Sequence, residues 1–247
     1  MVTGRTQEIV NLAKDIYESI KPSVGLNTFM INYNSFETIE LLLPFHNIYL
    51  EEQEFRVDSF CGFLMIDELE NTLVVNRNHE AYRKLFTIGH ELGHFFLHKH
   101  LQNAFFEKGL SDKIYSFSDL ILEREANIFA SELLVPCEVL ETMLRMKFNF
   151  FRIYKTIGVS KAALNWRLHR FLMDKFSIDS YFAHLLINDY ATKSLERIVE
   201  DSYMFFMDSN IHLQREIFAE LKGEESVFYI YKEIALEKQK EAPVKLY

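Results

Sequence analysis

The segment from His90 to His94 has the pattern H-E-x-x-H, in which two histidines stand four residues apart. On an α-helix these two side chains lie on one face, about one turn apart. Two imidazole nitrogens at this spacing can bind one metal ion, and a catalytic zinc site adds a third protein ligand and leaves a fourth position for water. Glu91 would project to the side of the ion, where its carboxylate can accept a proton from that water. The spacing therefore predicts a helix that carries a metal-dependent hydrolytic site.

Apolar residues flank this pattern on both sides at helical spacing, with Leu85, Phe86 and Ile88 before it and Phe95, Phe96 and Leu97 after it. They predict a helix that is largely buried. Two histidines and a glutamate on its inner side would be costly unless a partner satisfied them, and a metal ion is such a partner. The alternative is a surface helix whose histidines only bind water.

The third ligand must come from another part of the chain. His98 continues the series of histidines at every fourth position, but on an unbroken helix it lies about 12 Å along the axis from His90. Families that use a third downstream histidine break the helix with glycine, and here no glycine follows until Gly109. We therefore expect His98 and His100 to be residues of the helix C-terminus, where the helix dipole favours them.

A second helix is predicted from the apolar residues between 121 and 134, and Pro136 would end it. Glu123 and Asn127 lie one turn apart on this helix. Glu123 could ligate the metal, while Asn127 could accept a hydrogen bond from the outer nitrogen of a ligand histidine. Glu125 would point about 200° away from Glu123, which predicts a solvated or salt-bridged residue and leaves it as the alternative ligand.

The segments Phe86–His98 and Glu123–Pro136 together resemble the ImmA/IrrE family of metallopeptidases. Members of that family typically show F-T-x-A-H-E-x-G-H followed by E-x-x-A-N-x-F-A-x-x-L-L-x-P, and in this chain Gly89 replaces the usual alanine. The resemblance is densest over residues 80–136, weaker over 1–79 and 137–173, and fades beyond.

The resemblance implies that His90, His94 and Glu123 bind the metal and that Glu91 is the general base. It also implies a soluble bacterial or phage endopeptidase that cleaves a helix-turn-helix repressor and so derepresses mobile-element, phage or stress genes. Zn²⁺ is the expected ion for two histidines and one glutamate, and Mn²⁺ remains compatible with the ligand types. The oxyanion-stabilising residue is unassigned, with His79, Tyr82 and Tyr115 as candidates.

The composition agrees with an ordinary globular protein, with 49% hydrophobic and 26% charged residues. No apolar stretch approaches 18 residues, and the first ten residues lack the apolar core of a signal peptide. We therefore expect a cytoplasmic protein with no membrane partner. Cys61 and Cys137 both stand in apolar surroundings and are predicted to be buried thiols without a disulfide.

The net charge of −9 argues against a protein whose main partner is nucleic acid. Residues 151–173 are an exception, because this segment contains five basic residues and no acidic one. Within it, Ile157–Ser160 predicts a turn and an N-cap that opens a further helix. The segment resembles the helix-turn-helix-like region that follows the peptidase core in the family. It could contact DNA, or it could be a packing module or a dock for an acidic partner surface.

The sequence predicts an α+β fold, with a small sheet packed against helices that carry a zincin-like H-E-x-x-H core. An amphipathic helix is expected over residues 5–20 and a short helix around 35–43. Strands are expected over Phe60–Ile66 and Thr72–Asn76, joined by a polar turn. The segment Cys61–Ile66 is a candidate edge strand for binding an extended substrate. The stretch His100–Phe117 is predicted to be a loop, either a lid or an ordinary connection.

Three segments are therefore expected: a metallopeptidase core over 1–136, a helix-turn-helix-like segment over 137–175, and a helical region of unknown role over 176–247. In the last region, helices are predicted over Tyr190–Met207, Ile211–Leu221 and Ser226–Lys240. Its aromatic residues are expected to form a core, with a partner surface as the alternative. Two other functions stay open, namely a regulator that binds a repressor or toxin partner without cutting it and a DNA-binding regulator. Oligomeric state is not predicted.

Overall fold

The computed structural model describes residues 4–21, 30–57, 59–67, 70–101, 104–108, 117–207 and 210–241. The chain forms two compact units, one of Met1–Met143 with Arg152–Arg167 and one of Leu144–Phe151 with Leu168–Tyr247. Helices α7 (Phe150–Ile157) and α8 (Lys161–Phe176) contribute residues to both units.

The first unit contains a four-stranded sheet with the strand order β1-β3-β2-β4. Its strands are β1 (Ile48–Gln53), β2 (Phe60–Ile66), β3 (Asn71–Asn76) and β4 (Ala104–Lys108). The pair β1 and β3 is parallel, and the other two pairs are antiparallel. The structure confirms the two predicted strands and adds β1 and β4, neither of which the alternation of apolar residues had revealed.

Strand β2 is not an edge strand, so the prediction for Cys61–Ile66 was wrong. Leu64 of β2 is paired with Leu73 of β3 on one side and with Phe105 of β4 on the other. The reason is that β4 comes from the segment after the H-E-x-x-H helix, which was predicted to be only a loop. The rest of that predicted lid, residues 109–116, lies outside the described part of the chain.

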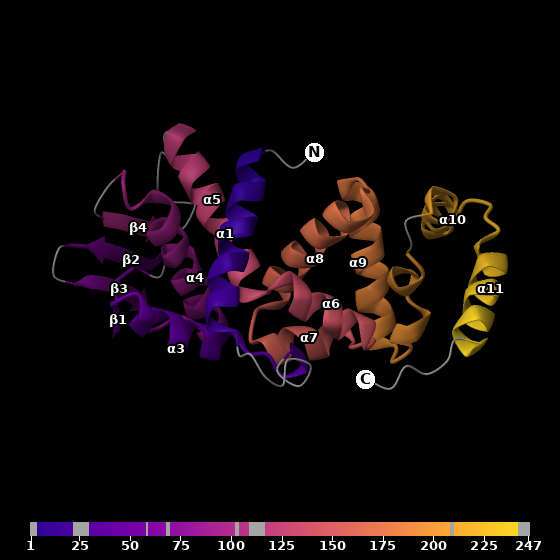
Figure 1. Ribbon diagram of the computed structural model, residues 1–247, viewed down its shortest axis with the longest axis horizontal. Helices are drawn as coiled ribbons and strands as arrows, with labels where there is room; N and C mark the ends of the chain where they lie inside the picture. Colours follow the sequence, from indigo (N-terminus) through magenta and orange to yellow (C-terminus); the bar gives the residue numbers. More distant parts are fainter. Residues whose placement is uncertain are drawn as a thin grey trace. The chain divides into compact units, whose positions relative to one another are not determined.

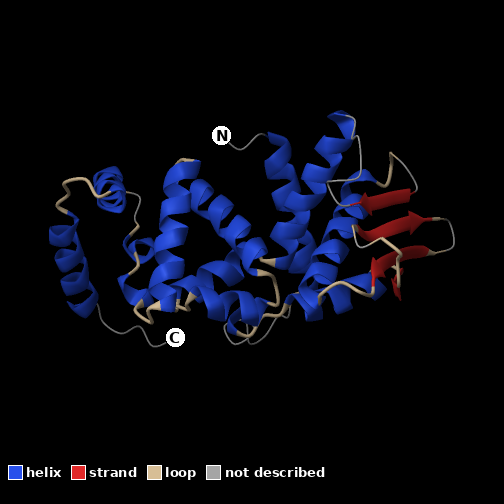
Figure 2. Cartoon of the chain, turned by 180° about the vertical axis from the view of Figure 1, so that it is seen from behind, coloured by secondary structure: helices blue, strands red, loops and turns tan. Residues whose placement is uncertain are grey.

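The first unit contains the helices α1 (Gly4–Ile20), α3 (Ser35–Phe45), α4 (Ala81–His98) and α5 (Phe117–Leu134), and α6 (Cys137–Arg145) begins in it. Helix α4 packs on β2 and β3, α5 packs on α4, and α1 packs on α5, as Figures 1 and 2 show. The predicted stripe of α1 is buried at Ile9, Ala13 and Ile16 because it faces α5. This layering places α4 in the middle of the unit, between the sheet and α5.

The two cysteines differ in their surroundings, which corrects one prediction. Both are free thiols, and Cys61 is buried as expected, but Cys137 is exposed. The apolar residues around Cys137 misled the prediction, because Val135 and Pro136 are buried while Cys137, the first residue of α6, faces outward. A disulfide between them has no support in the structure.

A tight turn joins α7 to α8, as the sequence predicts. Gly158 has a φ of +84°, a backbone conformation that a residue with a Cβ rarely adopts. The hydroxyl of Ser160 then accepts a hydrogen bond of 3.0 Å from the backbone N–H of Ala163, which is the expected N-cap of α8. Both the turn and the cap are confirmed.

The second unit is helical, with α9 (Ser180–Leu195), the short 3₁₀ helices η1 (Val199–Asp201) and η2 (Tyr203–Phe206), α10 (Ile211–Lys222) and α11 (Phe228–Glu241). The single helix predicted over Tyr190–Met207 was wrong. Helix α9 ends at Leu195 because the chain turns at Arg197, where φ is +63°. The helices predicted near α10 and α11 are confirmed.

The aromatic residues of this unit pack mainly into its core. The ring of Phe228, which is 5% exposed, lies 5.0 Å from that of Tyr203 and 5.7 Å from that of Phe206, measured between ring centroids. Tyr229, in contrast, is exposed. Among the described residues, no helix has both the length and the apolar character needed to cross a bilayer.

Candidate metal centre

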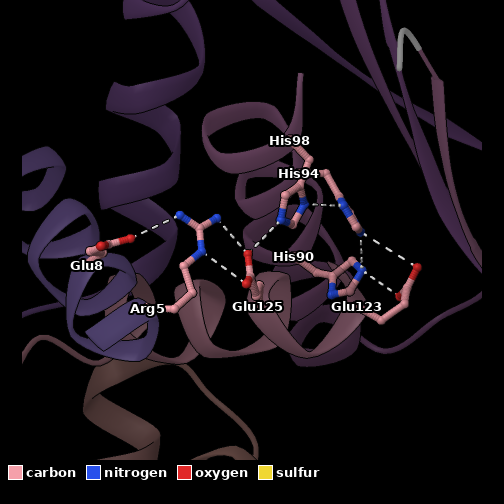
Figure 3. Close-up of polar contacts among 7 residues, drawn as sticks. All are labelled: Arg5, Glu8, His90, His94, His98, Glu123 and Glu125. Atoms are coloured by element: carbon pink, nitrogen blue, oxygen red, sulfur yellow. Dashed lines mark hydrogen bonds and ion pairs between the residues drawn. The ribbon is translucent and has the colours of Figure 1, made fainter. Parts of the chain in front are cut away.

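Helix α4 places the side chains of His90 and His94 against one another, one turn apart. The two Nε2 atoms lie 3.0 Å from each other, and the rings are 1% and 3% exposed (Figure 3). Both histidines belong to the face of α4 that is buried in the first unit. Two imidazole nitrogens therefore lie close together in a buried position.

Helix α5 contributes the carboxylate that completes this group. The Oε2 atom of Glu123 lies 3.2 Å from Nε2 of His90, and its Oε1 atom lies 3.8 Å from Nε2 of His94. The Glu123 side chain is 23% exposed, which makes it the most exposed of the three residues. One atom from each of the three residues can be chosen so that all lie within 4.8 Å of one another.

The spacing of these atoms suits a metal ion. Ligands about 2.05 Å from a tetrahedral zinc ion are separated by about 3.3 Å, which is close to the 3.0 Å between the two histidine nitrogens and the 3.2 Å between His90 and Oε2 of Glu123. The 3.8 Å distance to His94 involves the other carboxylate oxygen, Oε1. Two buried imidazoles and a carboxylate are also a common ligand set for zinc. His90, His94 and Glu123 therefore fit a divalent cation.

Small residues allow α4 and α5 to approach closely enough to form the cluster. A Cβ built on Gly93 would lie 2.8 Å from Cα of Ala126, so only glycine fits at this contact. At Gly89, one turn earlier, a Cβ would meet the side chain of Leu134 at 3.1 Å and that of Ala130 at 3.3 Å. These contacts are tight, but they involve side chains rather than backbone. They are compatible with alanine, which is usual at this position in the family that the sequence resembles.

Asn127 of α5 lies beside the outer nitrogen of His90. Its Oδ1 atom is 3.0 Å from Nδ1 of His90. If Nδ1 of His90 carries the ring proton and donates it to this amide oxygen, the lone pair of Nε2 faces the cluster. The structure thus places Asn127 next to His90, in a position to hydrogen-bond a ligand histidine as the sequence suggested.

Glu91 follows His90 on α4 and is 0% exposed, and both of its carboxylate oxygens are buried. It lies in the buried stretch of the helix that also holds both histidines. A carboxylate in such surroundings has little competing solvent, which is the environment in which a general base acts on a single water molecule.

His98 takes part in this network, although the sequence predicted only that it is a residue of the helix C-terminus. Its Nδ1 atom lies 3.0 Å from Nδ1 of His94, and its Nε2 atom lies 3.1 Å from Oε2 of Glu125. Glu125 in turn receives two hydrogen bonds from the guanidinium of Arg5, at 3.0 and 2.7 Å (Figure 3). The prediction that Glu125 is salt-bridged is confirmed, and the spacing of four residues between His94 and His98 was the signal for their contact.

Burial and charge set the ionisation of these outer groups. Burial lowers the pKa of His98 below its ordinary value, although Glu125 opposes this effect. The hydrogen bonds from Arg5 lower the pKa of Glu125. Burial thus favours the neutral form of the His98 imidazole, and the guanidinium of Arg5 favours the ionised form of the Glu125 carboxylate.

The three candidates for oxyanion stabilisation gain no role from the described contacts. His79 is buried with its Nε2 atom 3.5 Å from the side-chain nitrogen of Asn76, and Tyr82 is 40% exposed with its ring near that of Phe36. Tyr115 lies outside the described residues. This part of the site remains a prediction.

Comparison with known proteins identifies the family of the chain. Residues 43–169 match the sequence model of the peptidase M78 family, which is described as an IrrE N-terminal-like domain. The chain belongs to the ImmA/IrrE family. The matched region includes α4 and α5 completely, so every residue of the His90, His94 and Glu123 cluster lies within the family domain.

Among curated proteins, the chain is similar to "Metallopeptidase ImmA" of Bacillus subtilis strain 168, with 37% identity over 87 residues. The match spans 34% of this chain and about half, 46%, of the relative. Membership of the ImmA/IrrE family indicates a protein of the metallopeptidase type. Arg5 and helix α1 lie outside the matched region of the family.

Proposed function

We propose that this ImmA/IrrE-family chain is a zinc-dependent endopeptidase that hydrolyses a peptide bond in a helix-turn-helix transcriptional repressor. Cleavage of the repressor would derepress mobile-element, phage or stress genes. The proposal rests chiefly on one observation, the convergence of His90, His94 and Glu123. Glu91, the buried residue that follows His90 in the sequence, is the candidate base. The repressor as substrate is what membership of the family suggests.

His90, His94 and Glu123 would hold the ion in this proposal. A bound zinc ion would polarise the scissile carbonyl group and make a water molecule more acidic. Zinc is preferred because imidazole ligands suit it, while Mn²⁺ more often binds oxygen ligands. The accessible carboxylate of Glu123 leaves one side of the cluster open, which is where a peptide would have to approach.

Glu91 and Asn127 have separate tasks. The carboxylate of Glu91 accepts a proton from the attacking water and passes it to the leaving amide nitrogen. Asn127 keeps the ring of His90 in one orientation through its hydrogen bond to Nδ1. A site that served only to stabilise the fold would need the ligands but not a buried carboxylate such as Glu91.

The structure offers less support for DNA binding through residues 151–173. Arg167 of this segment is 3% exposed, and its guanidinium lies 2.8 Å from Glu132 and donates to the backbone oxygen of Val135 at 2.9 Å. A side chain in such contacts is not available to a phosphate group. Arg152, Lys155 and Lys161 are exposed. Because Arg167 is not, the segment offers fewer positive charges to DNA than its sequence suggested.

The decisive experiment compares the zinc-loaded chain with its Glu91→Gln variant. The genome is first searched for a small helix-turn-helix protein encoded beside the gene, each chain is incubated with that protein, and the products are read by mass spectrometry. We expect two fragments with the wild-type chain and intact repressor with Glu91→Gln, although the variant keeps one zinc ion per chain. The matched control is Glu80→Gln, at the exposed start of the same helix, which should cleave normally.

The same experiment separates the remaining alternative. A regulator that only binds its partner would form a stable complex with the repressor, with and without Glu91, and would release no fragments. Cleavage by Glu91→Gln at the wild-type rate would also contradict the proposal, because it would assign the reaction to another residue.

A further inference from the structure

Four residues from three helices form a continuous line of contacts that ends at the metal cluster. Arg5 of α1 binds both carboxylate oxygens of Glu125 on α5, Glu125 contacts Nε2 of His98 on α4, and Nδ1 of His98 contacts Nδ1 of His94. Figure 3 shows these side chains in sequence beside the cluster. Of these four residues, only His94 belongs to the metal cluster. The other three are linked to it through Nδ1 of its ring, while Nε2 belongs to the cluster.

The proton positions along this line follow from the role of His94. To bind a cation through Nε2, the neutral ring of His94 must carry its proton on Nδ1. That N–H then donates to Nδ1 of His98, and the ring proton of His98 therefore sits on Nε2 and points at the carboxylate of Glu125. Every donor in the line meets an acceptor, and one arrangement of protons satisfies all of the contacts.

The charges of the line support the same arrangement. Glu125 is only 13% exposed and His98 is 1% exposed, so the carboxylate acts on the imidazole in surroundings with little water. A carboxylate that accepts the proton of His98 makes Nδ1 of that ring a better acceptor for His94. Arg5 fixes the orientation of this carboxylate through two parallel hydrogen bonds.

We infer that Arg5, Glu125 and His98 are positioning residues that hold His94 in the orientation and tautomer needed for metal binding. This inference rests on the proposed metal site. It makes helix α1 part of the centre, although α1 lies outside the region matched by the family. Groups that orient metal ligands typically change metal affinity by about 10- to 100-fold when they are replaced.

The test measures zinc affinity rather than activity. Full-length wild-type chain and its variants are titrated with zinc in competition with a chromophoric chelator, and the visible spectrum of the Co²⁺-substituted forms is recorded. We expect His98→Phe to weaken zinc binding by about 10- to 100-fold, with a smaller loss for Glu125→Gln and Arg5→Met. The Co²⁺ spectrum should change in all three variants, because the orientation of His94 changes.

Two further variants distinguish positioning from a merely structural role of α1. Lys21, next to the other end of α1, lies 2.7 Å from Glu138 of α6, and this ion pair has no part in the line. Lys21→Met therefore removes a comparable tether and should leave zinc affinity and the Co²⁺ spectrum unchanged. Arg5→Lys, which keeps the charge, should recover part of the affinity lost in Arg5→Met.

A double-variant comparison tests the order of the contacts. If Arg5 acts through His98, Arg5→Met should have no further effect on zinc affinity in the His98→Phe background. Additive losses in the double variant, or wild-type affinity in both Arg5→Met and Glu125→Gln, would overturn the inference. Because Arg5 is a surface residue of α1, its variants remain informative even if His98→Phe fails to fold.

The outcomes for the positioning line and for the proposed function remain separable. Tight zinc binding that depends on Arg5 and Glu125, without any cleavage of repressor, would support the line and contradict the peptidase. Repressor cleavage, with a zinc affinity that these variants do not change, would support the peptidase and contradict the positioning line.

Discussion

Gly93 of α4 lies against the backbone of Ala126 in α5, so close that a Cβ added to Gly93 would stand 2.8 Å from Cα and 3.0 Å from the carbonyl oxygen of Ala126. Gly93 directly precedes His94, and Ala126 lies between Glu123 and Asn127. The distance between the two helices at this point therefore determines whether the carboxylate of one helix reaches the histidines of the other.

Gly93→Ala should separate the two helices and weaken the metal site. We expect a loss of about 1–3 kcal/mol in the free energy of unfolding, because backbone atoms of Ala126 must move, together with weaker zinc binding. Denaturant unfolding and zinc titration measure both effects. Gly89→Ala is the matched control, since its new methyl group meets only side chains and should cost little. Equal effects of the two substitutions would show that the backbone contact is not what sets the distance.

Removal of the metal should lower the thermal stability of the chain. An ion that binds only the folded state adds about 4 kcal/mol at a concentration 1,000 times its Kd, so a chelator should lower the melting temperature and zinc should restore it. His94→Ala should abolish this response, because it removes one of the three ligands. Calorimetry with zinc, with Mg²⁺ and with chelator is the measurement, and an equal response to Mg²⁺ would contradict a site built from two imidazoles.

The buried ion pair between Arg167 and Glu132 should be costly to break on one side. Arg167→Met would leave the carboxylate of Glu132, only 7% exposed, without its 2.8 Å partner, and we expect a loss of about 3–5 kcal/mol in the free energy of unfolding. The double variant with Glu132→Leu should recover much of this loss. As a comparison, Lys84→Met breaks a more exposed pair with Glu52 and should cost at most about 1 kcal/mol. Similar losses for Arg167→Met and Lys84→Met in urea unfolding would be evidence against the buried pair.

The stability of the second unit should depend on pH because of the carboxyl group of Asp189. Burial raises its pKa above the ordinary value of 3.8, although the Ser202 hydroxyl and the Tyr203 N–H donate to it. A raised pKa in the folded state contributes stability below pH 3.8 that is lost as the pH rises through the folded pKa. As the pH rises through the folded pKa, the free energy of unfolding of the wild-type chain should therefore fall relative to that of Asp189→Asn. Urea unfolding of both proteins from pH 3.5 to 7 measures the difference, and a constant difference would contradict the prediction.

The proximity of the candidate ligands could be expected from the sequence, because their positions obey short-range spacing. His90 and His94, one turn apart, and Glu123 and Asn127, also one turn apart, are fixed relative to each other by the helix alone. The family resemblance supplied the pairing of the two helices, which no local pattern contains. The contact between Arg5 and Glu125 joins residues 120 positions apart, so neither spacing nor the resemblance could indicate it.

The sheet was predicted only in part, because two of its strands carry weak patterns. In β1 only Ile48 is buried while the next five residues are exposed, so alternation of apolar and polar residues is missing. Strand β4 follows α4 in a segment whose polar residues and glycine suggested a loop. Because β4 was not predicted, β2 was expected to lie at the edge of the sheet. The sequence of β2 alone does not show the register in which another strand pairs with it.

The division of the metal cluster between two successive helices also has a consequence during translation. A nascent chain that has emerged only as far as α4 carries two of the three donors, and the carboxylate of Glu123 follows later. No complete centre can exist until α5 has left the ribosome and docked. In our proposal, the newly synthesised protein would thus stay inert toward its target until most of the first unit has assembled.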